Sequence, residues 1–332
     1  MRILAFETSC DDTGIAIVEN GQKVIANLLL SQSKSHRKYG GVFPELASRM
    51  HCESIIKLLI ELQTNYKLTS KNIDAIAVTQ GPGLEGSLLV GQATAKVFSK
   101  LWKRPLIGVN HLKGHIFSSF LNKSQELIPK FPFIALIISG GHTMLVKVIR
   151  AQKMHLLGQT RDDAVGEAYD KVARLLGLGY PGGPDIEKKA MKGNQQKYNF
   201  PRAMKHSPLE FSFSGLKTSI AQTVSKIQDV KEHVDDICAS FQKAVIDVLI
   251  HKTMQACKYE NISNLIVSGG VISNNLLRKK FQQFTIENNI ILSMPEMQFC
   301  TDNAAMIASA AYFNKDSKEN LNNVLVQPNL SI

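Results

Sequence analysis

The chain runs twice through the same series of predicted elements, and this internal duplication constrains its fold more than any other feature. The first pass has three β-patterned runs, at residues 2–7, 14–20 and 24–30. The second pass has matching runs at 133–138 and 143–149, and a third short strand is expected near 155–158. Two related α/β lobes are therefore predicted, as the length of 332 residues and the 44% hydrophobic content allow.

Each pass continues with a buried strand that ends in a glycine turn and opens a helix. The strand at 73–79 precedes Gly81-Pro82-Gly83, and the strand at 264–267 precedes Ser268-Gly269-Gly270. Helices are expected at 84–102 and from Asn274 to 284, and their free N–H groups favour an anion. Gly269 and Gly270 are therefore candidate phosphate contacts.

A further strand and helix complete each pass and supply the domain prediction. Strand 105–109 leads to a helix from His111, and strand 290–292 leads to a helix beginning at Asp302. We expect a first lobe at 1–125, completed by the helix near 302–315, and a second lobe at 126–300. Additions to this plan are a long helix at 44–66, an insertion at about 162–213 and a loosely held polar tail at 316–332.

His111 and His115 are four positions apart, so both imidazoles project from one face of a helix at metal-ligand spacing. Ordinary core or surface histidines are the alternative reading. If the lobes pack about a pseudo-twofold axis, the start of the Asp302 helix faces the start of the His111 helix across the cleft between lobes. Asp302 would then be a third ligand, although an aspartate at a helix start is commonly a cap. Two imidazoles and a carboxylate suit Fe²⁺ or Zn²⁺.

The net charge of 39 minus 28, or +11, favours a polyanionic partner. Basic residues gather between Lys188 and Lys217 with interleaved aromatic rings, a composition that suits RNA, and a second group comprises Lys34, His36, Arg37, Lys38 and Tyr39. A solvated basic face is the alternative for both groups. Five cysteines without Cys-x-x-Cys spacing, the absence of a leader pattern and the lack of a long apolar run indicate a cytoplasmic protein with no membrane partner.

Paired hairpin loops with glycine turns are typical of the actin, Hsp70 and sugar-kinase (ASKHA) architecture, in which a nucleotide lies between two related lobes. This analogy concerns the fold alone. A more specific match comes from short motifs that fall in order along residues 1 to 315. They are 7–11 (ETSCD), 44–49 (PELASR), 80–83 (QGPG), 111–115 (HLKGH), 139–143 (SGGHT), 161–171 (RDDAVGEAYDK), 180–184 (YPGGP), 211–218 (FSFSGLKT), 268–271 (SGGV) and 301–305 (TDNAA).

With these motifs the chain resembles the universal tRNA N6-adenosine threonylcarbamoyltransferases, a family formerly classed as O-sialoglycoprotein endopeptidases. It departs at Phe43, where the family usually has a smaller aliphatic residue, and at Ile272-Ser273, where two small residues usually precede the asparagine. The resemblance implies that one metal, preferably iron, is held by His111, His115 and Asp302. It also implies a substrate site formed by Ile137, Ile138, Ser139, Gly140, Gly141, Asp170, Gly183 and Asn274.

The implied reaction transfers a threonylcarbamoyl group from threonylcarbamoyl-AMP to the exocyclic amine of the adenosine 3′ to the anticodon. ATP or ADP is a further expected ligand. Asp11 is a candidate for a group behind the metal ligands or for proton handling, with an Asx-turn role as the alternative. No general base is evident from the sequence.

Family membership implies tRNA as a partner, together with an inactive paralogue of the same fold, a small P-loop ATPase and an upstream threonylcarbamoyl-AMP synthase. Apolar residues at 46, 50, 55 and 58 of the long helix would either dock the paralogue or pack on their own sheet. Two other functions stay open. A metallopeptidase lacks support because Leu112, rather than glutamate, follows His111. An ASKHA-type kinase or binding ATPase would have no need of the two histidines.

Overall fold

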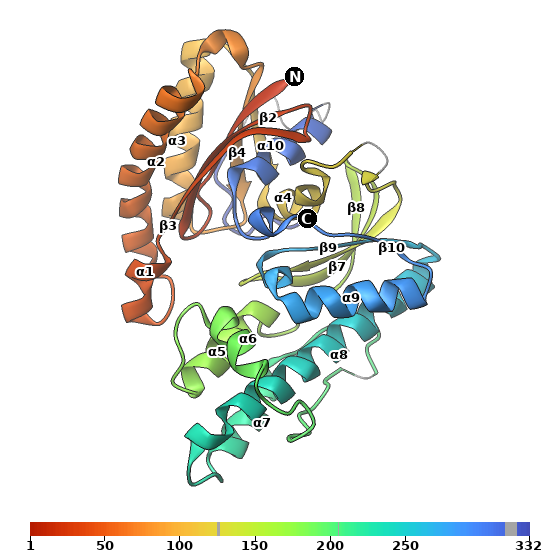
Figure 1. Ribbon diagram of the computed structural model, residues 1–332. Coiled ribbons are helices and arrows are strands. Elements are labelled where there is room, and N and C mark those ends of the chain that lie inside the picture. Colours follow the sequence, from red (N-terminus) through yellow and green to blue (C-terminus); the bar gives the residue numbers. More distant parts are fainter. Residues whose placement is uncertain (125–126, 205, 316–323) are drawn as a thin grey trace. The chain divides into compact units, whose positions relative to one another are not determined.

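The computed structural model describes residues 1–124, 127–204, 206–315 and 324–332 (Figure 1). The chain divides into two compact units. The first unit comprises Met1–Pro129, Arg150–Met154 and Pro295–Ile332, and the second comprises Lys130–Ile149 and His155–Met294. A search of the described residues for a helix long and apolar enough to cross a bilayer found none.

A five-stranded sheet forms the centre of the first unit, in the order β3-β2-β1-β4-β5. Its strands are β1 (Arg2–Glu7), β2 (Asp12–Glu19), β3 (Lys23–Ser31), β4 (Ala75–Gly81) and β5 (Leu106–Asn110). β1 pairs antiparallel with β2 and parallel with β4, which is in turn parallel to β5. The predicted Asn20-Gly21 turn joins β2 to β3, and both residues have positive φ values of 53° and 69°, as a tight hairpin turn of this kind requires.

The sheet of the second unit repeats this order, as β10-β9-β6-β7-β8. Its strands are β6 (Phe133–Ile138), β7 (Thr143–Arg150), β8 (Lys153–Gln159), β9 (Asn264–Ser268) and β10 (Ile291–Ser293). β6 is antiparallel to β7 and parallel to β9, just as β1 is to β2 and β4. The duplication predicted from the sequence is therefore confirmed, with strand ends that differ by one or two residues.

Helices pack on both faces of the first sheet. α2 (Pro44–Tyr66) and α3 (Glu85–Trp102) lie side by side on one face, and α4 (His111–Phe117) and α10 (Ala304–Phe313) lie on the other (Figure 1). α10 approaches β2 so closely at Gly14 that an added Cβ there would lie only 2.9 Å from the Ala304 nitrogen. Gly14 therefore permits the contact between this helix and the sheet. On α2, Ile55 and Leu58 belong to the core, so packing rather than docking is the role of these two residues.

The second unit contains most of the remaining helices. They are α5 (Val165–Leu175), α6 (Gly182–Ala190), α7 (Ser214–Val224), α8 (Val234–Glu260) and α9 (Asn275–Glu287). α7 and α8 occupy a stretch for which the sequence analysis assigned no element. The aromatic rings of Phe200, Phe211 and Phe213 are buried, so they are core residues and do not form the stacking surface expected between Lys188 and Lys217. Lys205 of that stretch lies outside the described residues.

Three further expectations differ from the structure. The Ser268-Gly269-Gly270 turn opens a 3-10 turn, Gly270–Ser273, before α9 begins. The Asp302 region and α10 belong to the same unit as α4, so the two helix starts do not face each other from different lobes. Of the tail expected at 316–332, positions 316–323 lie outside the described residues, and the described remainder is docked: Val324 is buried in the core of the first unit, and the Gln327 N–H donates to the Gln80 carbonyl at 2.9 Å.

Candidate metal and substrate sites

The first unit brings His111, His115 and Asp302 together, with ligand atoms that all lie within 4.8 Å of one another. We call these three residues the His–His–Asp cluster. Oδ1 of Asp302 lies 3.4 Å from Nε2 of His111 and 3.3 Å from Nε2 of His115. Among the described residues, no other group of histidine, cysteine or acidic side chains has comparable spacing.

Local capping explains why Asp302 is available as a ligand. Asn303 is the N-cap of α10, and its side chain accepts a hydrogen bond from the Met306 N–H at 3.0 Å. Asn110 plays the same part for α4, because its Oδ1 accepts from the N–H groups of Leu112 and Lys113. The capping role considered for Asp302 is therefore filled by its neighbour.

Glu7 and Ser9 complete the surroundings of His111; both belong to the 7–11 motif seen in the sequence, where neither was assigned a role. Nδ1 of His111 lies 3.1 Å from Oε2 of Glu7 and 3.1 Å from Oγ of Ser9. Glu7 is fully buried and also accepts hydrogen bonds from the Ser9 N–H and the Thr79 hydroxyl. A carboxylate directly after the apolar run at residues 3–6 of β1 was the signal that could have identified Glu7.

Electrostatics in this cluster favour an ionised carboxylate at Glu7. Burial would raise the pKa of Glu7, but the neighbouring His111 outweighs it and the pKa is lowered. Burial would likewise lower the pKa of His111, yet Asp302 and Glu7 hold it well above its usual value. Because an ionised carboxylate only accepts hydrogen bonds, Nδ1 of His111 is the donor, and the Nε2 lone pair points to the cluster once a cation replaces the second proton.

The donor set fits a bound metal. His115 is fully buried; its Nδ1 has no hydrogen-bond partner within the described part of the chain, and its Nε2 has only the Asp302 carboxylate, at 3.3 Å and without good hydrogen-bond geometry. An unsatisfied buried imidazole is costly, and a metal ion is the partner that this combination of two imidazoles and a carboxylate prefers. His111 and His115 meet edge to face, with ring centroids 4.7 Å apart.

Asp11 in the β1–β2 turn and Asp12, the first residue of β2, are both affected by the negative charge of Asp302. Burial, and then the Asp302 carboxylate, raise the pKa of Asp11. The same two causes raise the pKa of Asp12 to about 7. Asp12 therefore changes its charge near neutral pH, although the sequence analysis named only Asp11.

The second unit assembles the predicted substrate residues around the ends of β6 and β9. Ile137 and Ile138, the last two residues of β6, are fully buried, and the chain becomes exposed at Gly140 and Gly141. An added Cβ at Gly140 or Gly141 would meet no atom within 4 Å, so space remains above this turn. Gly269 packs on the end of β6, because its added Cβ would lie 2.4 Å from the Ile138 carbonyl oxygen.

Hydrogen bonds connect the remaining predicted substrate residues to the helices around them. Oδ1 of Asp170 on α5 accepts from the Gly182 N–H at 2.7 Å, next to Gly183. Oδ1 of Asn274 caps α9 through Leu277, while its Nδ2 donates to Gln242 at 2.8 Å. The Asn275 N–H already donates to Glu187, so this amide of the α9 start is not free for a phosphate.

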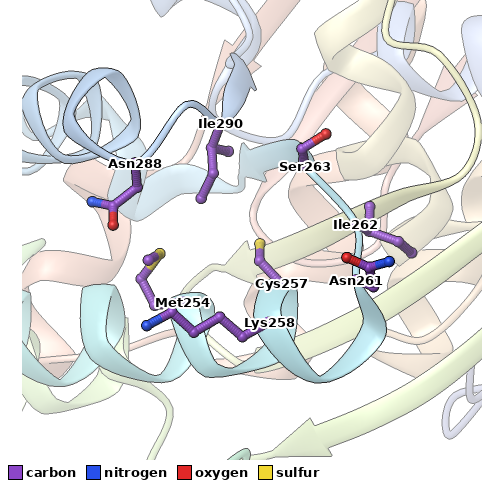
Figure 2. A pocket seen from close by; sticks show the side chains of 8 residues that line it. All are labelled: Met254, Cys257, Lys258, Asn261, Ile262, Ser263, Asn288 and Ile290. Carbon is purple, nitrogen blue, oxygen red and sulfur yellow. The ribbon is translucent and has the colours of Figure 1, made fainter.

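A separate cavity of about 270 Å³ lies between the ends of α8 and α9 (Figure 2). Its lining includes Met254, Cys257 and Lys258 from α8 and Asn288 and Ile290 beyond α9. Because α9 has 13 residues, this cavity and Asn274 are separated by roughly 20 Å along the helix. None of the predicted site residues lines it.

Together, the duplicated sheets and their helices define an ASKHA-type α/β protein. Two solved structures share this fold. Full-length HypF in a phosphate- and nucleotide-bound form aligns with a TM-score of 0.61 at 12% identity, over 95% of this chain and 47% of that one. The ADPNP-bound activator of 2-hydroxyisocaproyl-CoA dehydratase from Clostridium difficile aligns with a TM-score of 0.53 at 14% identity, over 97% and 99% of the two chains.

The chain belongs to the tRNA N6-adenosine threonylcarbamoyltransferase (TsaD) family, whose family model matches residues 23–309. A protein of that name from Clostridium kluyveri is 48% identical over 340 residues, which cover 100% of this chain and 98% of the relative. The resemblance seen in the sequence motifs is thus confirmed.

Proposed function

We propose that this protein transfers the threonylcarbamoyl group of threonylcarbamoyl-AMP to N6 of adenosine 37 in tRNAs that read codons starting with A. Family membership supports the reaction class. The single structural observation that carries the proposal is the His–His–Asp cluster, in which the fully buried His115 has, among the described residues, no polar partner other than Asp302. In this reaction the amine nitrogen bonds to the carbamoyl carbon, the bond from that carbon to the phosphate oxygen breaks, AMP leaves and the amine loses a proton.

The metal would be held by His111, His115 and Asp302, with Fe²⁺ as the proposed ion and Zn²⁺ as the alternative. When bound, it would supply positive charge and Lewis acidity for the transfer. Glu7 keeps the His111 ring in the orientation that directs Nε2 to the cluster. Asp11 is the proposed group behind the ligands, a role supported by the effect of the Asp302 carboxylate in raising its pKa.

The turn at Ile137–Gly141, together with Asp170, Gly183, Gly269, Gly270 and Asn274, is the proposed binding site for the acyl-adenylate and for ATP or ADP. The open space above Gly140 and Gly141 admits a ligand close to the backbone. Because the adenosine amine is a weak nucleophile, positioning by these groups would provide much of the rate enhancement. Backbone N–H groups of the turn are suited to stabilise negative charge on a carbonyl or phosphate oxygen.

A face of the first unit supports the proposed association with an inactive paralogue. Ile56 and Ile60 on α2 are 58% and 63% exposed, and Leu89 and Val97 on the adjacent helix α3 are 53% and 54% exposed. Exposed apolar side chains on two packed helices favour a protein partner. The small P-loop ATPase, the upstream synthase and the cytoplasmic location follow from the family alone.

The two rival functions have less support. A peptidase needs a base beside a bound water, and Leu112 occupies the position after His111 where a zinc-peptidase helix carries glutamate. A small-molecule kinase shares the fold, but the buried pair of histidines has no role in that chemistry.

In the test, the purified protein and its partner proteins are incubated with Fe²⁺, threonylcarbamoyl-AMP and a tRNA that decodes A-starting codons. Modified adenosine is then detected by mass spectrometry. We expect modification by the wild type and loss of at least a hundredfold in rate for His111→Ala and Asp302→Asn. His155→Ala, which changes an exposed histidine of β8, serves as the control. Absence of product from the wild type, or full activity of His111→Ala, would refute the proposal. Phosphate transfer without tRNA would favour the kinase instead.

A further inference from the structure

The segment Ser33–Phe43 carries exposed cations and exposed aromatic rings on one short surface of the first unit. It consists of α1 (Ser33–His36), a 3-10 turn (Arg37–Tyr39) and the link to α2. Tyr39 and Phe43 are 51% and 44% exposed, and their rings stack with centroids 5.2 Å apart. We call this segment the 33–43 loop. Stacked exposed rings are unusual for a face whose only contact is water.

Three cations belong to the same short segment as these rings. Lys34, Arg37 and Lys38 are exposed, and Nζ of Lys38 lies 4.9 Å from the centre of the Tyr39 ring. No acidic residue occurs between positions 32 and 43, and the following Glu45 pairs with Arg49 at 2.6 Å. The surface therefore combines positive charge with two flat apolar faces.

A buried frame holds the 33–43 loop in shape. His36 is fully buried, with Nε2 3.1 Å from Oε1 of Gln32. The N–H of Phe43 donates to Nδ1 of His36 at 3.2 Å, and this bond fixes the backbone beneath one of the rings. Gly40, at φ 66°, ends the 3-10 turn in the left-handed region that glycine adopts without strain. The rings are thus preorganised, and little conformational entropy of the loop is lost when a ligand stacks on them.

The loop is tied to the turn that precedes β2, beside the His–His–Asp cluster. The Gln32 N–H donates to the Asp11 carbonyl at 3.0 Å. From α2, Nε2 of His51 lies 3.0 Å from the Cys10 carbonyl oxygen, and Nδ1 lies 2.7 Å from the Thr13 hydroxyl. A molecule seated on the 33–43 loop is therefore held near the reacting centre.

We propose that the 33–43 loop binds unpaired nucleotides of the tRNA anticodon loop, with Tyr39 and Phe43 stacking on bases and Lys34, Arg37 and Lys38 contacting phosphates. This inference rests on the proposed function, which requires an adenosine of a single-stranded RNA loop to reach the His–His–Asp cluster. Stacking platforms next to cations are the usual means of binding single-stranded RNA. Charge complementarity with RNA favours this occupant over an apolar protein surface.

The experiment compares two variants with wild-type protein in complex with its partners. In the triple variant Lys34→Ala, Arg37→Ala, Lys38→Ala, we expect the slope of log affinity against log salt for tRNA to fall by about 2, since each phosphate contact in single strands contributes about 0.7. Tyr39→Ala should weaken tRNA binding about tenfold, whereas Tyr39→Phe should bind as the wild type does. Both damaging variants should raise KM for tRNA far more than they lower kcat.

Matched controls separate local from general electrostatics. Lys71→Ala, Lys96→Ala, Lys100→Ala removes the same three charges from exposed positions elsewhere in the first unit. Since α2 has 23 residues, its far end, which precedes Lys71, lies roughly 35 Å from the 33–43 loop. This variant should retain most of the salt dependence. Thermal unfolding and Co²⁺ affinity, measured in every variant, show whether the fold and the metal site are intact.

The outcomes distinguish this inference from the proposed function. Unchanged tRNA affinity and salt slope in both loop variants of a modifying enzyme would overturn the loop's role alone. Loss of paralogue binding with normal tRNA binding would show that the loop is a protein interface, and the inference would be wrong. If the wild type binds tRNA through the loop but modifies nothing, the reaction is wrong and the loop's role stands.

Discussion

Nδ1 of His111 lies 3.1 Å from Oε2 of the fully buried Glu7, so a carboxylate at the end of β1 orients the first imidazole of the His–His–Asp cluster. The same carboxylate accepts from the Ser9 N–H and the Thr79 hydroxyl. Such outer partners of metal ligands fix the tautomer and raise ligand basicity. The Glu7 side chain thereby couples β1 to α4, the helix that carries His111 and His115.

Glu7→Gln tests this coupling. The amide offers one acceptor where three donors converge, so we expect the affinity for Co²⁺, followed by its visible absorption, to fall by about 10- to 100-fold. Glu19→Gln, which changes a more exposed carboxylate of β2 that pairs with Arg2, should bind Co²⁺ as the wild type does. Equal affinity in Glu7→Gln and wild type would show that His111 needs no orienting carboxylate.

Asp12→Asn should stabilise the metal-free protein at neutral pH. Burial and the Asp302 carboxylate raise the pKa of Asp12 to about 7 from its ordinary 3.8, so the folded state binds this proton more tightly than the unfolded state. The contribution of Asp12 to the free energy of unfolding of the wild type therefore falls as pH rises from about 4 to 7, and it stays constant at higher pH.

Urea unfolding in EDTA from pH 4 to 8 measures this effect. The advantage of Asp12→Asn should be near zero at pH 4, grow towards pH 7 and exceed about 1 kcal/mol at pH 8. Glu61→Gln, at an exposed position of α2, should show no such trend. An advantage independent of pH would mean that Asp12 does not titrate in this range.

The C-terminal segment around Ser331 should stabilise the start of α4, the helix that carries His111 and His115. Nδ2 of Asn110 donates to the Ser331 carbonyl at 2.9 Å, while Oδ1 of the same residue caps α4. Deletion of residues 330–332 removes that carbonyl, so we expect faster amide hydrogen exchange at Leu112 and Lys113 and about tenfold weaker Co²⁺ binding. Gln327→Ala keeps the backbone bond to Gln80 and should match the wild type. Unaltered exchange in the deletion variant would contradict this role.

Adjacent isoleucines of α2 should separate folding from association. Ile55 is in the core, so Ile55→Ala should lower the free energy of unfolding by about 2–4 kcal/mol. Ile56→Glu with Ile60→Glu changes exposed positions and should cost less than about 1 kcal/mol. In pull-down with the paralogue, only the glutamate pair should abolish binding by the folded protein. Retained binding would exclude this face of α2 as the interface.

Much of the fold was predictable because its signals are local. Strand periodicity identified β1 and β6 with their observed ends, and the proline before a helical pattern identified α2 from Pro44 to Tyr66. α7 and α8 were not predicted, although α8 is the longest described helix. It is buried on many sides, so its residues lack the clear amphipathic period that identifies a surface helix.

The candidate site was predictable only in part. The i, i+4 spacing of His111 and His115 identified a pair of candidate ligands, and Asp302, expected from the duplication as the third, lies 3.3–3.4 Å from both. The expectation that Asp302 would reach the histidines from the other lobe was wrong, because Asp302 belongs to the same unit as α4. Glu7 and the docked C-terminal segment were missed, since their contacts join residues about 100 or more positions apart.

The sequence by itself determined the duplication, the family and the residue types of the metal set, because periodicity and motif spacing are properties of neighbouring positions. Tertiary structure alone decided which groups serve the cluster: Asn303 caps α10 so that Asp302 is free to ligate, and Glu7 turns His111 towards it. It also decided which apolar residues are core and which are surface, since burial depends on what α10 and the sheet cover. These choices depend on contacts between distant segments, which no local pattern encodes.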